Sequence, residues 1–145
     1  YYIDDLVVTS NSATVMQSGF EETLLVNNSS TNFTYVTTDK RSGNRSMYVS
    51  NADANWKGPE FTISEAGDYT LTAYVKSDSG SQEFCFKDTT SYQAHGTQTN
   101  NGSEWTQITA AVTVPEGGMT FRINCPGASE TNIVSYFIDD FKVTQ

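Results

Sequence analysis

The sequence has little positive charge. It contains 8 Lys+Arg against 17 Asp+Glu, for a formal net charge of -9 at pH 7. Nucleic acids and anionic membrane surfaces are bound largely through basic side chains, so we expect neither as a partner. The chain also has no apolar run long enough to cross a bilayer, in line with its mean hydropathy of -0.45.

Histidine and cysteine are scarce as well. The lone His95 cannot build a His/Cys metal cluster, and its ordinary interpretation is a solvent-contacting residue. Of the two cysteines, Cys85 alternates with inward phenylalanines and is predicted to point outward. Cys125 shares the parity of Phe121 and Ile123 and is predicted to point inward. Opposed directions disfavour a bridge, so we expect two free thiols.

No segment shows a 3.6-residue apolar period, and short alternating runs separated by turn residues dominate instead. The clearest run is 69–76, where Tyr69, Leu71, Ala73 and Val75 share one face. Asn100-Asn101-Gly102 is a strong turn signal. The pattern predicts an all-β fold, an antiparallel β-sandwich of the jelly-roll kind with about ten strands.

A similar nine-residue segment occurs near both ends of the chain. Residues 1–9 and 136–144 are identical at six of nine positions. A strand that closes one unit and also precedes the next is typical of tandem modules. We therefore interpret residues 1–9 as the tail strand of a preceding module, 10–13 as a linker and 14–145 as one module.

The closing strand contains two adjacent carboxylates. Alternation predicts Phe137, Asp139 and Phe141 on the core-facing side. A buried carboxylate must be paired, hydrogen-bonded or metal-bound, so Asp139 is either a cation ligand or a residue at the wet rim of an edge strand. Because Asp139 and Asp140 point to opposite faces, they cannot form the facing pair that glycoside hydrolysis needs, although carboxylate pairs from distant strands stay open. With a single histidine and no phosphate-cradling glycine loop, we expect no enzymatic activity.

Two aromatic residues lie in polar surroundings. Trp56 follows a polar loop, and Tyr92 lies among small polar residues. Aromatic faces pack against the C–H faces of sugars while neighbouring polar groups bind the hydroxyls. The alternative for Trp56 is that it caps one end of the core. Trp105, which begins a strand, is predicted to lie in the core.

Six segments occur in an order that resembles the family 22 carbohydrate-binding modules and their family 4 and 9 relatives. They are Ser18–Glu21, Gly43–Val49, Asn55–Pro59, Gly67–Lys76, Glu104–Thr106 and Phe137–Asp140. The resemblance runs from about Thr14 to the end of the chain. It implies a jelly-roll module attached to a glycoside hydrolase, commonly a xylanase, with xylan bound on one concave sheet.

The resemblance also implies ligand-binding positions. Trp56 matches the tryptophan of the family's Trp-x-Gly motif, and Tyr92 matches a tyrosine ahead of the strand that precedes Glu-Trp-Thr. Arg122 and Asn124 stand where xylan binders often have a Tyr and a Glu, which replaces a stacking platform and an acceptor by a guanidinium and an amide. Two other tyrosines are candidates for the missing platform: Tyr35 and Tyr48.

Related modules carry a structural calcium ion near the sandwich edge. The matching positions are the Gly19 carbonyl, Glu21, Ser42, the Arg45 carbonyl and Asp139. Oxygen ligands of this kind suit Ca²⁺. By resemblance, the ion would connect the first and last strands without touching sugar.

The leading hypothesis is a non-catalytic module that binds a β-linked plant cell-wall polysaccharide, xylan or arabinoxylan first. It would be extracellular and covalently attached to catalytic and other binding modules. The alternative is a structural, spacer or adhesion β-sandwich in which Trp56 and Tyr92 are merely packed.

Overall fold

The computed structural model of the chain describes residues 14–18 and 32–145, and these contain ten β-strands and no helix. The strands are β1 (Thr14–Ser18), β2 (Phe33–Val36), β3 (Ser46–Ala52), β4 (Glu60–Ile63), β5 (Gly67–Ser77), β6 (Gln82–Asp88), β7 (Ala94–Asn100), β8 (Thr106–Val114), β9 (Met119–Asn124) and β10 (Val134–Thr144). The predicted tail strand 1–9 and linker 10–13 lie outside the described residues.

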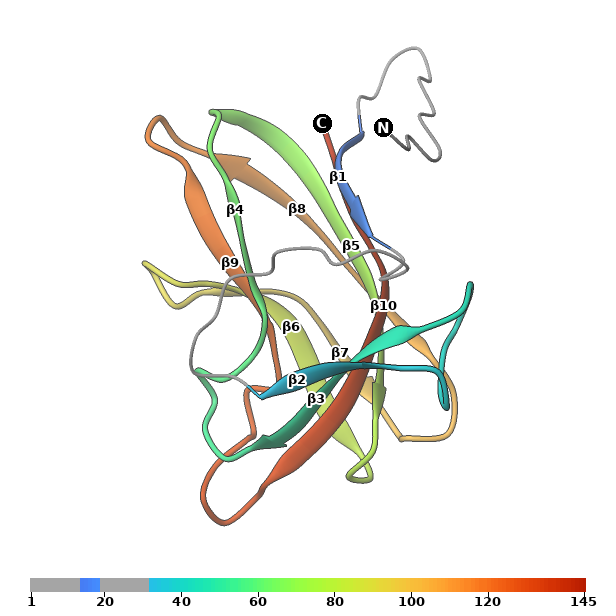
Figure 1. Cartoon of the computed structure of the whole chain (residues 1–145). Coiled ribbons are helices and arrows are strands. Elements are labelled where there is room, and N and C mark those ends of the chain that lie inside the picture. The colour runs from blue at the N-terminus through green and yellow to red at the C-terminus, as the bar shows by residue number, and fades with distance from the viewer. Residues whose placement is uncertain (1–13, 19–31) are drawn as a thin grey trace.

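The strands form two antiparallel sheets that pack as two layers (Figure 1). The six-stranded sheet has the order β2-β3-β10-β5-β8, with β1 pairing β10, and the four-stranded sheet has the order β4-β9-β6-β7. The predicted all-β antiparallel sandwich is confirmed. No helix in the described part is long and apolar enough to cross a membrane.

Aromatic side chains from both sheets fill the space between the layers. Phe61 on β4 stacks on Phe121 of β9, with ring centroids 5.6 Å apart, and also contacts Phe141 of β10 at 4.6 Å. Tyr136 of β10 packs against Phe84 of β6. Burial of such side chains dominates the free energy that holds the sheets together.

The strand at 69–76 follows its predicted alternation. Tyr69, Leu71, Ala73 and Val75 of β5 are all buried in the core, while the residues between them are exposed or half-buried. The period-2 pattern therefore predicted correctly which side of β5 faces the core. The strand lies inside the sheet, paired with β10 on one side and β8 on the other.

The face assignment of the closing strand β10 was wrong in its first half. Tyr136 and Ile138 point into the core, and the Tyr136 hydroxyl donates to the Ile123 carbonyl of the opposite sheet at 3.0 Å. Phe137 packs instead against Tyr48 on the outer side of the six-stranded sheet. The register shifts between Asp139 and Lys142, where Asp140 has a φ of 47°. This bulge reverses the alternation, so that Phe141 again points inward.

Asp139 is nevertheless fully buried, because the β2–β3 connection covers it. The backbone amides of Arg41 and Ser42 donate to its Oδ2 at 2.9 and 3.1 Å, and the Asp140 amide donates to its Oδ1 at 2.8 Å. Arg41 pairs with Asp140, and its guanidinium lies 3.5 Å from the ring centroid of Tyr74. The connection is therefore fixed to the outer side of β10 and β5.

Both cysteines are free, as expected, and both are buried. Cys125 belongs to the hydrophobic core, whereas Cys85 alternates with the core residues Phe84 and Phe86 and does not. The prediction for Trp105 was wrong: it is half-buried and lies against Phe137 on the outer side of the six-stranded sheet, with centroids 6.4 Å apart.

Candidate binding face

The outward side of the four-stranded sheet carries a row of side chains in register. Glu60 of β4 pairs with Arg122 of β9, which pairs with Lys87 of β6, which pairs with Ala94 of β7. The strand neighbours of Glu60, Arg122 and Lys87 include core residues, and Ala94 is exposed, so the row lies on the surface. We call this side of β4, β9, β6 and β7 the outer face.

Arg122 is held in the floor of the outer face by an ion pair. Its Nε donates to Glu60 Oε1 at 3.0 Å, and its Nη2 bonds to the same oxygen. The Arg122 side chain is only 11% exposed. Gly58 lies close to both Arg122 and Ile123. A Cβ at Gly58 would be 2.3 Å from the Ile123 carbonyl oxygen and 3.1 Å from the Cγ of Arg122. The connection before β4 thus packs directly onto β9.

Asn124 is on the same side but has no exposed surface. Its Nδ2 donates to the carbonyl of Asn55, and its Oδ1 accepts from the Cys85 thiol at 3.1 Å. Both ends of the amide are therefore engaged within the protein. Asn124 fixes the backbone of the residue that precedes Trp56, and it acts on a ligand only through that residue.

Trp56 lies in the turn between β3 and β4, beside the edge strand β4. It is 48% exposed, one of the few large apolar side chains that the described residues expose. Lys57 supports the turn: its ammonium forms an ion pair with Asp53 at 2.7 Å and lies 5.5 Å from the Trp56 ring centroid. The alternative in which Trp56 caps the core does not match this exposure.

Tyr92 lies in the turn between β6 and β7 and is 69% exposed. Thr89, at the start of this turn, bonds to the Thr120 carbonyl of β9. The turn is closed by Asp88, which accepts from the Thr90 amide at 2.7 Å and from the Ser91 hydroxyl. Burial acts to raise the pKa of Asp88, but the hydrogen bonds from Ser91 and Thr90 outweigh it and the pKa is lowered. Tyr92 itself has a φ of 59°, a conformation that projects a side chain from a tight turn.

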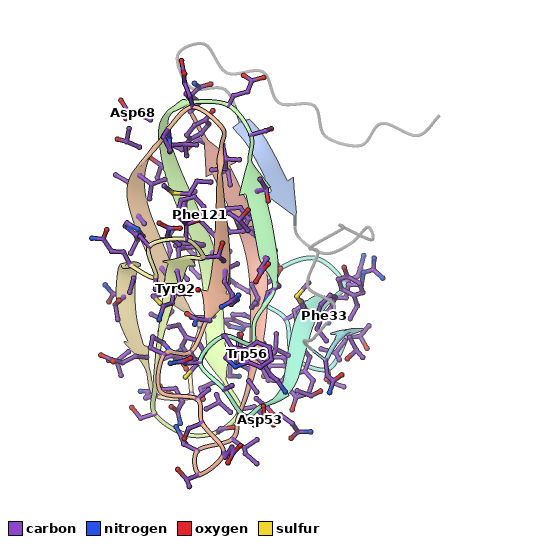
Figure 2. All side chains as sticks on the ribbon, turned by 90° about the vertical axis from the view of Figure 1, so that its left-hand side faces the viewer. Phe33, Asp53, Trp56, Asp68, Tyr92 and Phe121 are labelled. Carbon is purple, nitrogen blue, oxygen red and sulfur yellow. The ribbon has the colours of Figure 1, made fainter. Side chains whose placement is uncertain are left out.

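Figure 2 looks onto the four-stranded side of the molecule, and both aromatic residues lie on the side turned to the viewer. Trp56 comes from the connection that enters β4, and Tyr92 from the connection that leaves β6. Asn55, next to Trp56, bonds to Asn124, and Thr89 of the Tyr92 turn bonds to Thr120, so the two turns contact β9 on either side of Arg122. The structure brings Trp56, Tyr92 and Arg122 together around one sheet.

The other two candidate platforms belong to the six-stranded sheet. Tyr48 of β3 packs on Phe137 and donates to Asp78 at 2.9 Å, on the far side of the molecule from the outer face. Tyr35 of β2 packs partly against the core, beneath the guanidinium of Arg45. Neither is brought to the outer face.

Sequence reasoning missed Glu60 and Lys87. Their places opposite Arg122 depend on which strands pair and in which register. The one available signal was the parity of Lys87 with Cys85, which marks it as outward.

Three of the five candidate calcium positions are described: Ser42, Arg45 and Asp139. Gly19 and Glu21 lie outside the described residues. Within the described part no three His, Cys, Asp or Glu side chains are grouped to hold a metal ion. Burial raises the pKa of Asp139 although three backbone amides act to lower it. The three hydrogen bonds therefore do not fully replace the hydration that the Asp139 carboxylate loses on burial. A nearby cation would stabilise the charged form of this carboxylate.

Comparison with known proteins finds a family match and a set of similar structures. The model of the carbohydrate binding domain family matches residues 12–128. No curated protein matches the chain. Two of the similar solved structures come from Paenibacillus barcinonensis Xyn10C: its CBM22-1 xylan-binding domain has a TM-score of 0.75 at 13% identity, covering 94% of this chain and 96% of that one. The CBM22-2 xylan-binding domain of the same protein has a TM-score of 0.74 at 19% identity. This match covers 89% of this chain and 98% of that domain.

A third similar structure holds a catalytic module as well. It is the CBM22-1-GH10 part of Clostridium thermocellum xylanase 10B, complexed with xylohexaose. The TM-score is 0.74 at 20% identity, and the match covers 92% of this chain but 28% of that one. At these identities the structural matches establish the shared fold.

Proposed function

Since the chain belongs to the carbohydrate binding domain family, we propose that it is a non-catalytic module for a β-linked plant cell-wall polysaccharide, xylan or arabinoxylan first. The observation that carries the proposal is the exposure of Trp56 and Tyr92 on two turns that contact β9 on either side of Arg122. Both flank a surface whose other side chains are polar or charged, which is the combination that sugar rings require.

The proposed ligand is a polymer because the face is extended. Four strands side by side, about 4.8 Å apart, span roughly 15 Å, which is wider than one sugar ring. A chain lying on this face passes the two turns that carry Trp56 and Tyr92. Binding at such an open surface is expected to be weak, in the micromolar to millimolar range of about -8 to -4 kcal/mol.

The biological setting follows from the same proposal. A module of this kind would be extracellular and covalently attached to a glycoside hydrolase, whose local concentration on insoluble substrate it raises. The similar structures of xylanase modules support this setting. The hydrolysis would belong to the attached enzyme and not to this chain.

The proposal is tested by affinity electrophoresis in soluble xylan. The wild-type chain should be retarded, and Trp56→Ala and Tyr92→Asn should each lose about five- to tenfold in affinity, since one ring–sugar contact is worth about 1–1.5 kcal/mol. Asparagine is chosen at 92 because it tolerates the positive φ of that residue. Removing the phenol ring then leaves the turn unstrained.

The control is Ile133→Ala, which removes an apolar side chain that is 53% exposed outside the outer face. It should leave retardation unchanged. Absence of retardation on every glycan tried would favour the spacer or adhesion module instead. Release of reducing sugar from xylan by the purified chain would contradict the non-catalytic assignment.

We also propose a structural calcium ion held by Ser42, the Arg45 carbonyl and Asp139 together with the Gly19 carbonyl and Glu21. The support is the donor chemistry: hydroxyl, carbonyl and carboxylate oxygens suit Ca²⁺. The raised pKa of buried Asp139 adds a reason for a positive charge beside it. When bound, the ion would supply charge compensation and a cross-link, and no part in sugar recognition.

A further inference from the structure

One positive charge on the outer face, that of Lys87, has no ion-pair partner among the described residues. Lys87 and Arg122 are direct cross-strand partners on β6 and β9. Glu60, on the far side of Arg122, bonds to the guanidinium. Lys87 is half-buried and has no hydrogen bond or ion pair within residues 14–18 and 32–145. Like charges placed directly opposite each other destabilise a sheet.

In the described part of the chain, no carboxylate is paired with Lys87. Its other cross-strand partner is Ala94 of β7, whose methyl group carries no charge. Glu83 shares its strand face but lies four residues away, which is about 13 Å along an extended strand. Asp53, on the Trp56 turn, is already paired with Lys57. Within residues 14–18 and 32–145, the ammonium of Lys87 therefore has no carboxylate partner.

We propose that the outer face binds a glycan that carries carboxylate groups, with Lys87 as the residue that recognises a uronate. This inference rests on the proposed function, since it specifies the ligand class of that same face. A carboxylate above the row would accept from the Lys87 ammonium while the polymer backbone lies between Trp56 and Tyr92. It would also relieve the repulsion between Lys87 and Arg122, which an uncharged sugar cannot do.

The test compares one polymer in two forms. Glucuronoxylan and the same preparation with its uronates chemically reduced to neutral sugars differ only in carboxylate. Wild-type chain should bind the native polymer about three- to tenfold more tightly in affinity electrophoresis, the range for one partly covered charged hydrogen bond. The difference should shrink at 0.5 M NaCl, because salt screens exposed charge pairs.

Variants then assign the effect to one residue. Lys87→Met should bind both forms equally, and Lys87→Arg should keep the preference for the native form. Lys142→Met is the matched control, because it removes the same charge from a half-buried strand position on β10 of the other sheet. It should behave as wild type. If Lys87→Met does not fold, the two-polymer comparison on wild-type chain still decides the question.

The outcomes separate the two proposals. Equal binding of native and reduced polymer by wild-type chain overturns the uronate inference and leaves polysaccharide binding intact. A preference that persists in Lys87→Met overturns the assignment to Lys87. Binding of neither polymer, nor of neutral arabinoxylan, overturns the proposed function and the inference with it.

Discussion

At the scale of single residues, Asn124 shows how a matching position can take a different role. By resemblance it stands where a ligand-binding carboxylate is common, yet its side chain has no exposed surface and bonds to Asn55 and Cys85. Its influence on a sugar would pass through the turn that presents Trp56. The position serves the site as a support.

Replacing Asn124 tests this support. Asn124→Ala should cost about 1–3 kcal/mol of unfolding free energy, because the Asn55 carbonyl loses its donor. It should also weaken xylan affinity, although no ligand contact is removed. In a Trp105→Phe background Trp56 is the only tryptophan, so acrylamide quenching of its fluorescence should increase in the variant.

The matched control is Asn100→Ala, another buried asparagine with several hydrogen bonds, on β7. It should lower the unfolding free energy without changing Trp56 quenching or xylan affinity in the folded chain. If Asn124→Ala leaves both the quenching and the affinity unchanged, Asn124 does not position Trp56.

At the scale of elements, the bulge in β10 decides which residues are buried. Without it, Phe137 and Asp139 would face the core, as alternation predicts; with it, Tyr136 and Ile138 do so before the bulge and Phe141 after it. A register shift of one residue moves side chains to the other face. Asp140 gives no signal of this in the sequence, because many aspartates occur in strands without bulges.

The β2–β3 connection and β10 together make a pH-dependent contact. Burial raises the pKa of Asp139 in the folded chain. The folded chain then holds this proton more tightly than the unfolded chain, whose pKa is about 3.9. The stability that Asp139 contributes is present below that value and is lost as the pH rises through the raised folded pKa.

Asp139→Asn lacks this titration. In EDTA, the unfolding free energy of wild type minus that of Asp139→Asn should fall as the pH is raised from about 3.5, and should level off above the folded pKa. Urea unfolding of both proteins at matched pH values measures it. A difference that grows with pH would mean that the three backbone amides overcompensate for burial.

Much of the fold followed from the sequence because period-2 patterning and turn residues are local. The β5 alternation from Tyr69 to Val75 and the turn at Asn100-Asn101-Gly102 are of this kind. The exposures of Trp56 and Tyr92 agree with their polar surroundings. The row from Glu60 to Lys87 and the burial of Asn124 did not follow, because both depend on pairings between strands far apart in the chain.

At the scale of the whole molecule, a bound calcium ion would appear as added stability. A ligand that binds the folded state by mass action contributes about 2.7 kcal/mol at one hundred times its dissociation constant. For a chain of this size, about 3 °C in Tm corresponds to each kcal/mol. Millimolar Ca²⁺ should therefore raise Tm by several degrees over EDTA, as measured by calorimetry.

Asp139→Asn should abolish that rise, and Mg²⁺ should not replace Ca²⁺, because its shorter bonds demand stricter octahedral geometry. Trp56→Ala should keep the rise in full, since the ion would not touch the outer face. A Tm that EDTA leaves unmoved in the wild-type chain would remove the calcium proposal.

The division into two layers has a consequence for how such a module can diversify. The covering loop and its buried acid belong to β10 and its neighbours, whereas the indole, the phenol and the charged row belong to β4, β9, β6 and β7. Contact between the layers consists of aliphatic and aromatic packing together with the bond from Tyr136 to Ile123. Exchange of outward side chains on one layer can thus retune glycan choice while the other layer goes on maintaining the shape.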